Sequence, residues 1–194
     1  MSEGGILQRQ KAELAAILYE KSYLEGDFTL SSGRKSHYYF DCRQSSLYPA
    51  GARLIGTLFF NMLKDMNVQA VAGMTLGADP LLTATSLAAL EAGRSLPALI
   101  VRKEAKNHGA ALLIEGLKNV RPGDRVVMLE DVVSTGASVL KAAEKIERAG
   151  LEVASVFCIL NREEPDGIEA FVAAGRELKS LFTRAELTTL ARRS

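Results

Sequence analysis

The chain has 194 residues, of which 47% are hydrophobic and 24% are charged, and its formal net charge is +1. This length favours one domain with a substantial hydrophobic core. The small net charge gives no electrostatic case for a nucleic-acid partner or an anionic membrane surface, and no apolar run approaches the roughly 20 residues that cross a bilayer. Residues 1–5 lack the basic and apolar regions of a signal peptide, so we expect a cytoplasmic protein.

The N-terminal part of the chain predicts two helices on either side of a turn-rich segment. Apolar residues at helical spacing indicate a helix over residues 6–20, and a second helix is expected from Pro49 to about Met66. Between them, residues 28–41 are first rich in turn residues and then aromatic. We expect a short hairpin there, outside the main sheet.

From residue 68 onward, apolar strand patterns alternate with helical patterns. Strands are predicted over residues 68–74, 97–101, 125–129 and 151–160, and helices over 81–92 and from about 139 to Gly150. This alternation is typical of an α/β fold, a parallel twisted sheet flanked by helices with right-handed crossovers.

The C-terminal part predicts shorter elements. Residues 168–173 are expected to form a short strand and residues 178–182 an edge strand. Thr183 and Glu186 have the spacing of a capping box at the start of a terminal helix. Cys42 and Cys158 lack metal-ligand spacing, and we expect both to be structural.

The strongest chemical signal follows the apolar strand 125–129. Glu130 and Asp131 come next, then two valines and the small polar turn 134–138, which opens a helix. Ligands of α/β sheets bind beyond the carboxyl ends of strands, and amides at a helix start bind anions. Carboxylates for sugar hydroxyls beside an amide nest for phosphate indicate a sugar phosphate. The alternative is a buried strand whose carboxylates only cap nearby loop amides.

A second signal is a basic segment that leaves the strand 97–101. Four potential cations lie within seven positions: Arg102, Lys103, Lys106 and His108. Like charges this close repel one another, so an anionic ligand such as a diphosphate would compensate them, and a loop of this length is often functional. The alternative is a solvated loop or short helix in which Glu104 pairs with the lysines, and composition alone leaves both open.

Three separated motifs resemble those of known phosphoribosyltransferases. The segment 126–138 resembles the phosphoribosyl diphosphate signature of the type I family. Residues 102–109 with 114–116 resemble the catalytic loop of orotate phosphoribosyltransferases, and residues 28–41 resemble the hood motif that covers the pyrimidine in that family. The likeness runs from about Ala15 to Leu190. It implies a single type I phosphoribosyltransferase domain over 1–194, with a hood formed mainly by residues 22–45 plus C-terminal elements.

The resemblance implies how the donor is held. It assigns Glu130 and Asp131 to the ribose hydroxyls and the following turn to the 5′-phosphate. The donor site then comprises the acidic pair with Val132, Val133, Ser134, Thr135, Gly136, Ala137 and Ser138. The diphosphate is assigned to Arg102, Lys103, Lys106 and His108, partly in the partner subunit's active site, which implies a homodimer. The catalytic set is then Lys103, Lys106, His108 and Asp131.

The resemblance also implies an orotate site, formed by Lys35, Tyr39, Phe40, Ser134 and Arg162. Two structural alternatives apply. The aromatic residues 38–40 alternate along a strand and cannot all face one ligand, so at least one is expected in a cross-strand cluster. Arg162 could instead form an ion pair with Glu163 or Glu164.

Three positions depart from the family pattern. Ser31 and Leu76 stand where some members have lysine, and Ser134 stands where threonine is common. Lys35 is the candidate to replace the lysine that is absent at residue 31.

The implied activity is transfer of ribose 5-phosphate from phosphoribosyl diphosphate to orotate in UMP synthesis. The implied cofactor is Mg²⁺, held mainly by substrate oxygens and without a set of protein ligands. Two alternatives remain: a type I phosphoribosyltransferase for a purine base, and a non-catalytic regulator that senses the phosphoribosyl ligand.

Overall fold

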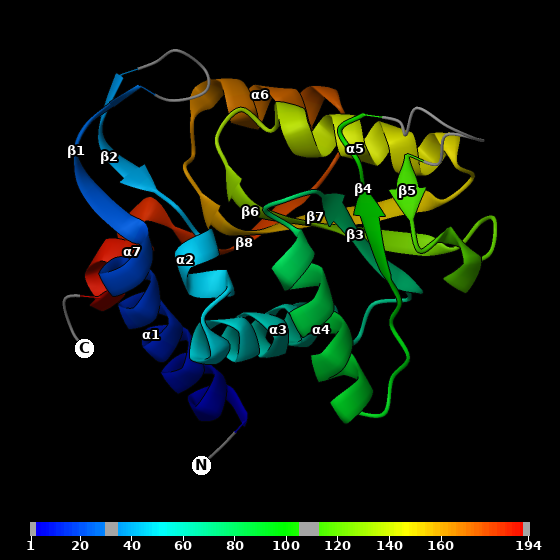
Figure 1. Cartoon of the computed structure of the whole chain (residues 1–194), viewed down its shortest axis with the longest axis horizontal. Coiled ribbons are helices and arrows are strands. Elements are labelled where there is room, and N and C mark those ends of the chain that lie inside the picture. Colours follow the sequence, from blue (N-terminus) through cyan, green and yellow to red (C-terminus); the bar gives the residue numbers. More distant parts are fainter. Residues whose placement is uncertain (1–2, 30–34, 105–112, 192–194) are drawn as a thin grey trace.

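A six-stranded sheet forms the centre of the molecule in the computed structural model, which describes residues 3–29, 35–104 and 113–191 (Figure 1). The strand order is β5-β4-β3-β6-β7-β8. Five strands are parallel and β5 is antiparallel to β4. The strands are β3 (Ala70–Met74), β4 (Ala98–Val101), β5 (Ile114–Glu115), β6 (Arg125–Val133), β7 (Glu152–Asn161) and β8 (Leu178–Thr183). The predicted parallel sheet flanked by helices is confirmed.

Helices cover both faces of this sheet and create two apolar cores. One face carries α1 (Glu3–Ser22), α3 (Pro49–Leu63), α4 (Asp79–Glu91) and α7 (Arg184–Ala191), and the other carries α5 (Ala137–Arg148) and α6 (Pro165–Ala173). Side chains alternate across β6, with Val127 and Leu129 in the first core and Val126 and Met128 in the second. The interpretation of this strand as buried on both faces is confirmed.

A separate antiparallel hairpin joins α1 to the rest of the chain. It consists of β1 (Tyr23–Thr29) and β2 (Lys35–Phe40), and it stands apart from the main sheet in Figure 1. The predicted hairpin is therefore present, although it begins at Tyr23 rather than Phe28. Two short helices, α2 (Arg43–Ser46) and the 3-10 helix η1 (Leu117–Asn119), complete the described elements.

Two sequence predictions about element bounds are wrong. Residues 168–173 are not a strand but belong to α6, which begins with Pro165 and Asp166; proline and an acidic residue both favour a first helical turn. The strand predicted to end at Leu129 continues to Val133, because the ten-residue strand β7 supplies pairing partners for its last residues. Glu130 and Asp131 therefore lie within β6 near its carboxyl end.

The predictions for the C-terminal end are confirmed. β8 is the last strand of the sheet, and the capping box forms at the start of α7. The Thr183 N–H donates to Glu186 Oε2 at 2.9 Å, and the Glu186 N–H donates to Thr183 Oγ1 at 3.3 Å. Cys42 and Cys158 are both buried, and both are free thiols rather than members of a disulfide bond. Within the described ranges, no helix is both long enough and apolar enough to cross a bilayer.

Candidate active site

A cavity of about 670 Å³ lies at the carboxyl ends of β3, β6 and β7, beside the hairpin. Ten of the residues that the sequence assigns to a site line it: Tyr39, Phe40, Lys103, Glu130, Asp131, Val132, Ser134, Thr135, Ser138 and Arg162. These residues come from four parts of the chain that are far apart in sequence. The fold thus brings the hood, the start of the basic segment and the acidic strand to one place.

The remaining predicted site residues that the structure describes do not line this cavity. Val133 is buried, and Ala137 lines a neighbouring groove along α5. Arg102 forms an ion pair with Glu115 at 3.2 Å, and Lys35 donates a hydrogen bond to Thr29 Oγ1 at 3.0 Å. Gly136 is the residue before α5 and packs on α6. Lys106 and His108, and the hood position Ser31, fall outside the described residues.

The acidic pair forms the floor of the cavity. Glu130 is 7% exposed, and its burial raises the pKa of the carboxyl group well above its usual value, with a further contribution from the negative charge of Asp131. The Lys103 ammonium acts in the opposite direction and lowers this pKa. A buried carboxylate in this state is stabilised by hydroxyl donors or by a cation.

Asp131 is fixed by two close contacts. Its Oδ1 accepts a hydrogen bond from the Val132 N–H at 2.7 Å. On the other side, the turn after β3 approaches so closely that a Cβ on Gly77 would lie 2.8 Å from Asp131 Oδ2. Residue 77 must therefore lack a side chain if the Asp131 carboxylate is to keep its place.

The turn after β3 is a part of the site of which the sequence singled out only Leu76, as a position where some family members have lysine. Met74, Thr75, Leu76 and Gly77 line the cavity, and the Thr75–Leu76 peptide bond is cis. The Thr75 hydroxyl donates to Asp79 Oδ2 at 2.9 Å and ties the turn to the first residue of α4. Small and apolar turn residues carry little chemical signal, but a turn at the carboxyl end of a central strand, next to the acidic strand, was the available clue.

The second missed feature is an ion pair below the hairpin. Arg43 makes a bidentate contact with Asp41, with Nε at 2.7 Å from Oδ1 and Nη2 at 3.1 Å from Oδ2, and both residues line the cavity. Hydrogen bonding from Arg43 lowers the pKa of the Asp41 carboxyl. Among the described basic residues of the hairpin and α2, the Arg43 guanidinium lines the cavity, whereas Lys35 is held beside Thr29.

The small polar turn 134–138 is supported from below by α6. Gly167 of α6 lies so close that a methyl group there would overlap the Ser134 carbonyl oxygen, and a Cβ on Gly136 would lie 2.6 Å from the Phe171 ring. The hydroxyl-bearing residues Ser134, Thr135 and Ser138 line the cavity above this contact. The helix α6, part of which was predicted to be a strand, therefore sets the position of the turn.

Both structural alternatives for the aromatic and arginine residues hold in part. Tyr38 is buried in a cluster, stacked on Tyr23 at 5.8 Å, with the guanidinium groups of Arg162 and Arg184 over its ring at 4.8 and 4.3 Å. Tyr39 points the other way and is 36% exposed. Arg162 pairs with Glu164 at 3.2 Å and also lines the cavity, so an ion pair and a place in the site are compatible.

Comparison with known proteins decides the family. No family model matches the sequence. The orotate phosphoribosyltransferase of Thermosynechococcus vestitus is 46% identical over 184 residues, which cover 95% of this chain and 96% of that protein. The chain belongs to the orotate phosphoribosyltransferase family. The family resemblance that three motifs predict is thus confirmed.

Solved structures of orotate phosphoribosyltransferases share the fold. The enzyme of Mycobacterium tuberculosis, in a complex with Fe(III) dicitrate, is 38% identical with a TM-score of 0.79, and the match covers 92% of this chain and 98% of that one. A structure of the same enzyme in complex with 5-phospho-alpha-D-ribosyl 1-diphosphate is 35% identical with a TM-score of 0.76, covering 92% and 99%. The type I phosphoribosyltransferase fold follows for this orotate phosphoribosyltransferase family member.

The contact between Gly77 and Asp131 generates a prediction. A methyl group in Gly77→Ala will push the Asp131 carboxylate aside, since the contacted atom is the end of a side chain and can move. We expect kcat/KM for phosphoribosyl transfer to fall between about tenfold and a hundredfold, because small misplacements of a positioning group are costly. Thermal unfolding should shift by only a few degrees.

Gly4→Ala provides the control for that substitution, because nothing lies within 4 Å of a Cβ at residue 4. Its kinetics should match those of the unaltered protein. Unchanged kinetics in Gly77→Ala would show that the position of Asp131 is unimportant.

Proposed function

We propose that the protein transfers the ribose 5-phosphate group from phosphoribosyl diphosphate to orotate, giving orotidine 5′-phosphate and diphosphate in pyrimidine synthesis. Membership of the family supports this function. The observation that carries it is the junction of Glu130 and Asp131 with the hydroxyl-lined turn 134–138 in one cavity. The related Mycobacterium tuberculosis enzyme has been crystallised with the phosphoribosyl donor, which agrees with such a cavity.

In this proposal the acidic pair holds the ribose hydroxyls and the turn holds the 5′-phosphate. As diphosphate leaves, positive charge develops on the ribosyl carbon, and carboxylates nearby stabilise it. Lys103, which lines the cavity, and Lys106 and His108 further along the chain neutralise the departing diphosphate. Catalysis then comes from positioning and charge stabilisation, and no side chain acts as a nucleophile.

The donor set of the cavity fits a magnesium ion that the substrate carries. Among the described residues, no group of three or more His, Cys, Asp and Glu side chains could hold a metal alone. Glu130 and Asp131 could each contact a metal-bound donor, and Mg²⁺ prefers phosphate oxygens and keeps several waters. When bound, Mg²⁺ would neutralise charge on the diphosphate.

For orotate, we propose a site between the hood and the carboxyl end of β7. Tyr39 and Phe40 offer aromatic faces, Arg162 offers charge to the carboxylate and Ser134 a hydroxyl. Lys35 contacts Thr29, which lines the cavity, and it remains the candidate for the absent hood lysine. Arg184 of α7 lies over the Tyr38 ring, which supports a hood made of residues 22–45 and C-terminal elements.

The direct test is loss of orotate absorbance on addition of phosphoribosyl diphosphate. We expect turnover with Mg²⁺ and little or none after chelation of the metal. Parallel reactions receive adenine or hypoxanthine instead of orotate. Turnover with a purine and none with orotate would assign a different base, and donor binding without turnover of any base would indicate a regulator.

The basic segment allows a second test. Lys106→Ala should lower kcat by two or more orders of magnitude without unfolding the protein, because it removes charge stabilisation of the leaving group. Lys118→Ala, an exposed lysine in η1, is the control and should retain normal kcat. Near-normal turnover of the Lys106 variant would remove this lysine from the mechanism.

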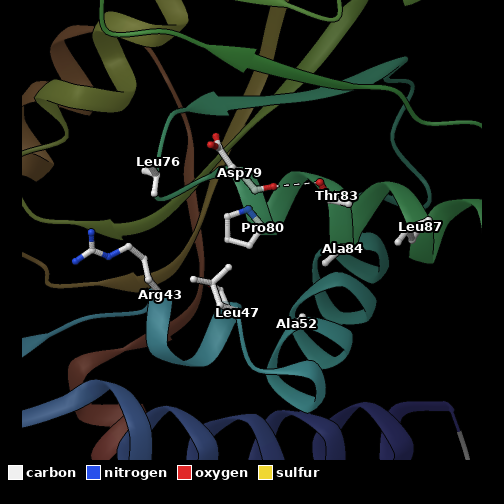
Figure 2. Close-up of a pocket in the computed structure, with 10 residues that line it drawn as sticks. Arg43, Leu47, Ala52, Leu76, Asp79, Pro80, Thr83, Ala84 and Leu87 are labelled. Carbon is white, nitrogen blue, oxygen red and sulfur yellow. Dashed lines mark hydrogen bonds between the residues drawn. The ribbon is translucent and has the colours of Figure 1, made fainter.

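We also propose that the protein is a homodimer joined through an apolar groove between α2, α3 and α4. The groove has a volume of about 520 Å³, and the side chains of Leu47, Leu76 and Leu87 around it are 70%, 65% and 56% exposed. Figure 2 shows Leu47 below Pro80, with Leu76 at one end of the groove and Leu87 at the other. Soluble proteins rarely leave such a group of large apolar side chains uncovered.

The position of the groove favours a second copy of the chain as its occupant. Arg43 and Leu76 line both this groove and the substrate cavity, so the two adjoin. A partner seated here would lie at the rim of the active site. This placement agrees with the shared active sites that the family resemblance implies.

Leu87→Glu tests the dimer surface. A buried carboxylate on each side of a two-fold interface is costly, so we expect a monomer in sedimentation analysis and at least tenfold lower turnover. Val172→Glu is the matched control, since Val172 is 74% exposed on α6 at the opposite face of the sheet. If Leu87→Glu remains dimeric, the interface lies elsewhere.

A further inference from the structure

Lys145, in the last turn of α5, is bonded to the main chain just beyond β4. Its ammonium group donates hydrogen bonds to the carbonyl oxygen of Arg102 at 2.8 Å and to that of Lys103 at 3.1 Å. The next residue, Ile146, is buried in the core that also contains Val101 of β4. Figure 1 shows α5 lying across this face of the sheet. The packing of α5 on the sheet thus fixes the position of the Lys145 ammonium group relative to the residues that follow β4.

The same short stretch is anchored at two other points. The Arg102 N–H donates to the Leu113 carbonyl oxygen at 2.7 Å, and the Arg102 guanidinium pairs with Glu115 at 3.2 Å. These two contacts hold Arg102, whereas the hydrogen bond from Lys145 also holds the carbonyl group of Lys103. Lys103 in turn lines both the substrate cavity and the groove along α5. The backbone that carries this cation into the cavity is therefore held by α5.

The chemistry of lysine suits this task. An ammonium group has three donors and no acceptor, and carbonyl oxygens at the end of a strand need donors. Hydrogen bonds from a charged donor are shorter and stronger than neutral ones. Two of the three donors of Lys145 are engaged by the main chain. Lys145 is therefore suited to orient the backbone of Arg102 and Lys103 rather than to bind the substrate directly.

We propose that Lys145 is a positioning residue for the transfer reaction, which holds the Arg102–Lys103 backbone so that the Lys103 side chain faces the departing diphosphate. This inference rests on the proposed function, because the role of Lys103 is part of that function.

The first experiment compares Lys145→Met with Lys141→Met. Methionine keeps most of the aliphatic stem, so packing on α5 changes little. Lys141 lies one turn earlier, lines the same groove and is exposed, so its substitution removes an equal charge at a similar place. We expect Lys145→Met to lower kcat/KM for phosphoribosyl diphosphate at least tenfold with KM for orotate unchanged, and Lys141→Met to stay within about twofold.

Lys145→Arg tests the hydrogen bonds themselves. A guanidinium can also donate to two carbonyl oxygens, so most of the lost kcat/KM should return. No recovery in the arginine variant, or equal losses in the methionine variants of residues 141 and 145, would overturn the proposal.

The second experiment asks whether Lys145 acts through Lys103. In a Lys103→Ala background, Lys145→Met should lower kcat/KM by no more than about twofold, since the group it positions is gone. An undiminished tenfold loss in that background would show a general structural role and refute the proposal.

The unaltered protein in the same assays separates this inference from the proposed function. If it fails to turn over orotate, the proposed function fails. The same variants are then compared by calorimetric binding of phosphoribosyl diphosphate with Mg²⁺. The same pattern of losses in affinity would support Lys145 as a positioning residue, and equal affinities would refute it.

Discussion

The structure depends on one strand, β6, that is buried on both faces and yet carries two carboxylates near its carboxyl end. The apolar residues of β6 connect the two cores, so the position of the strand is fixed by packing on either side. Glu130 is buried as part of this strand, and its burial, together with the negative charge of Asp131, raises the pKa of its carboxyl group. Burial of this kind is unfavourable for the protein alone and favourable once a ligand supplies hydroxyl groups or a cation. This unfavourable burial is located in the wall of the cavity, at the carboxyl end of the central strands.

Neighbouring elements fix the positions of Asp131 and of the turn that follows β6. The turn after β3 is packed against Asp131, and α6 is packed against the turn that follows β6. In both cases a glycine allows main chain or side chain to approach more closely than any larger residue could. The positions of both turns are thus determined by helix and strand packing.

Sequence reasoning predicted the parts of the site that have chemical character. The pairing of Glu130 with Asp131 and the polar turn after them were visible, because charged and hydroxyl residues at the end of an apolar strand are unusual. Thr75, Gly77 and the ion pair of Arg43 with Asp41 were not predicted as site residues, since their place in the cavity depends on tertiary packing. The same limit explains α6: residues 168–173 are apolar enough for a strand, and only the proline and acidic residue ahead of them indicate a helix. Ion pairing decided the place of Arg102, which contacts Glu115 rather than the cavity.

The ring of Tyr38 joins segments from opposite ends of the chain. One guanidinium on it comes from the end of β7, the other from the terminal helix, and the ring itself belongs to the N-terminal hairpin. This buried cluster is therefore a composite of early and late sequence, and through Arg162 it adjoins the cavity that Glu130 and Asp131 also line. A substitution at Tyr38 would therefore disturb three segments at once: the hairpin, the end of β7 and the terminal helix.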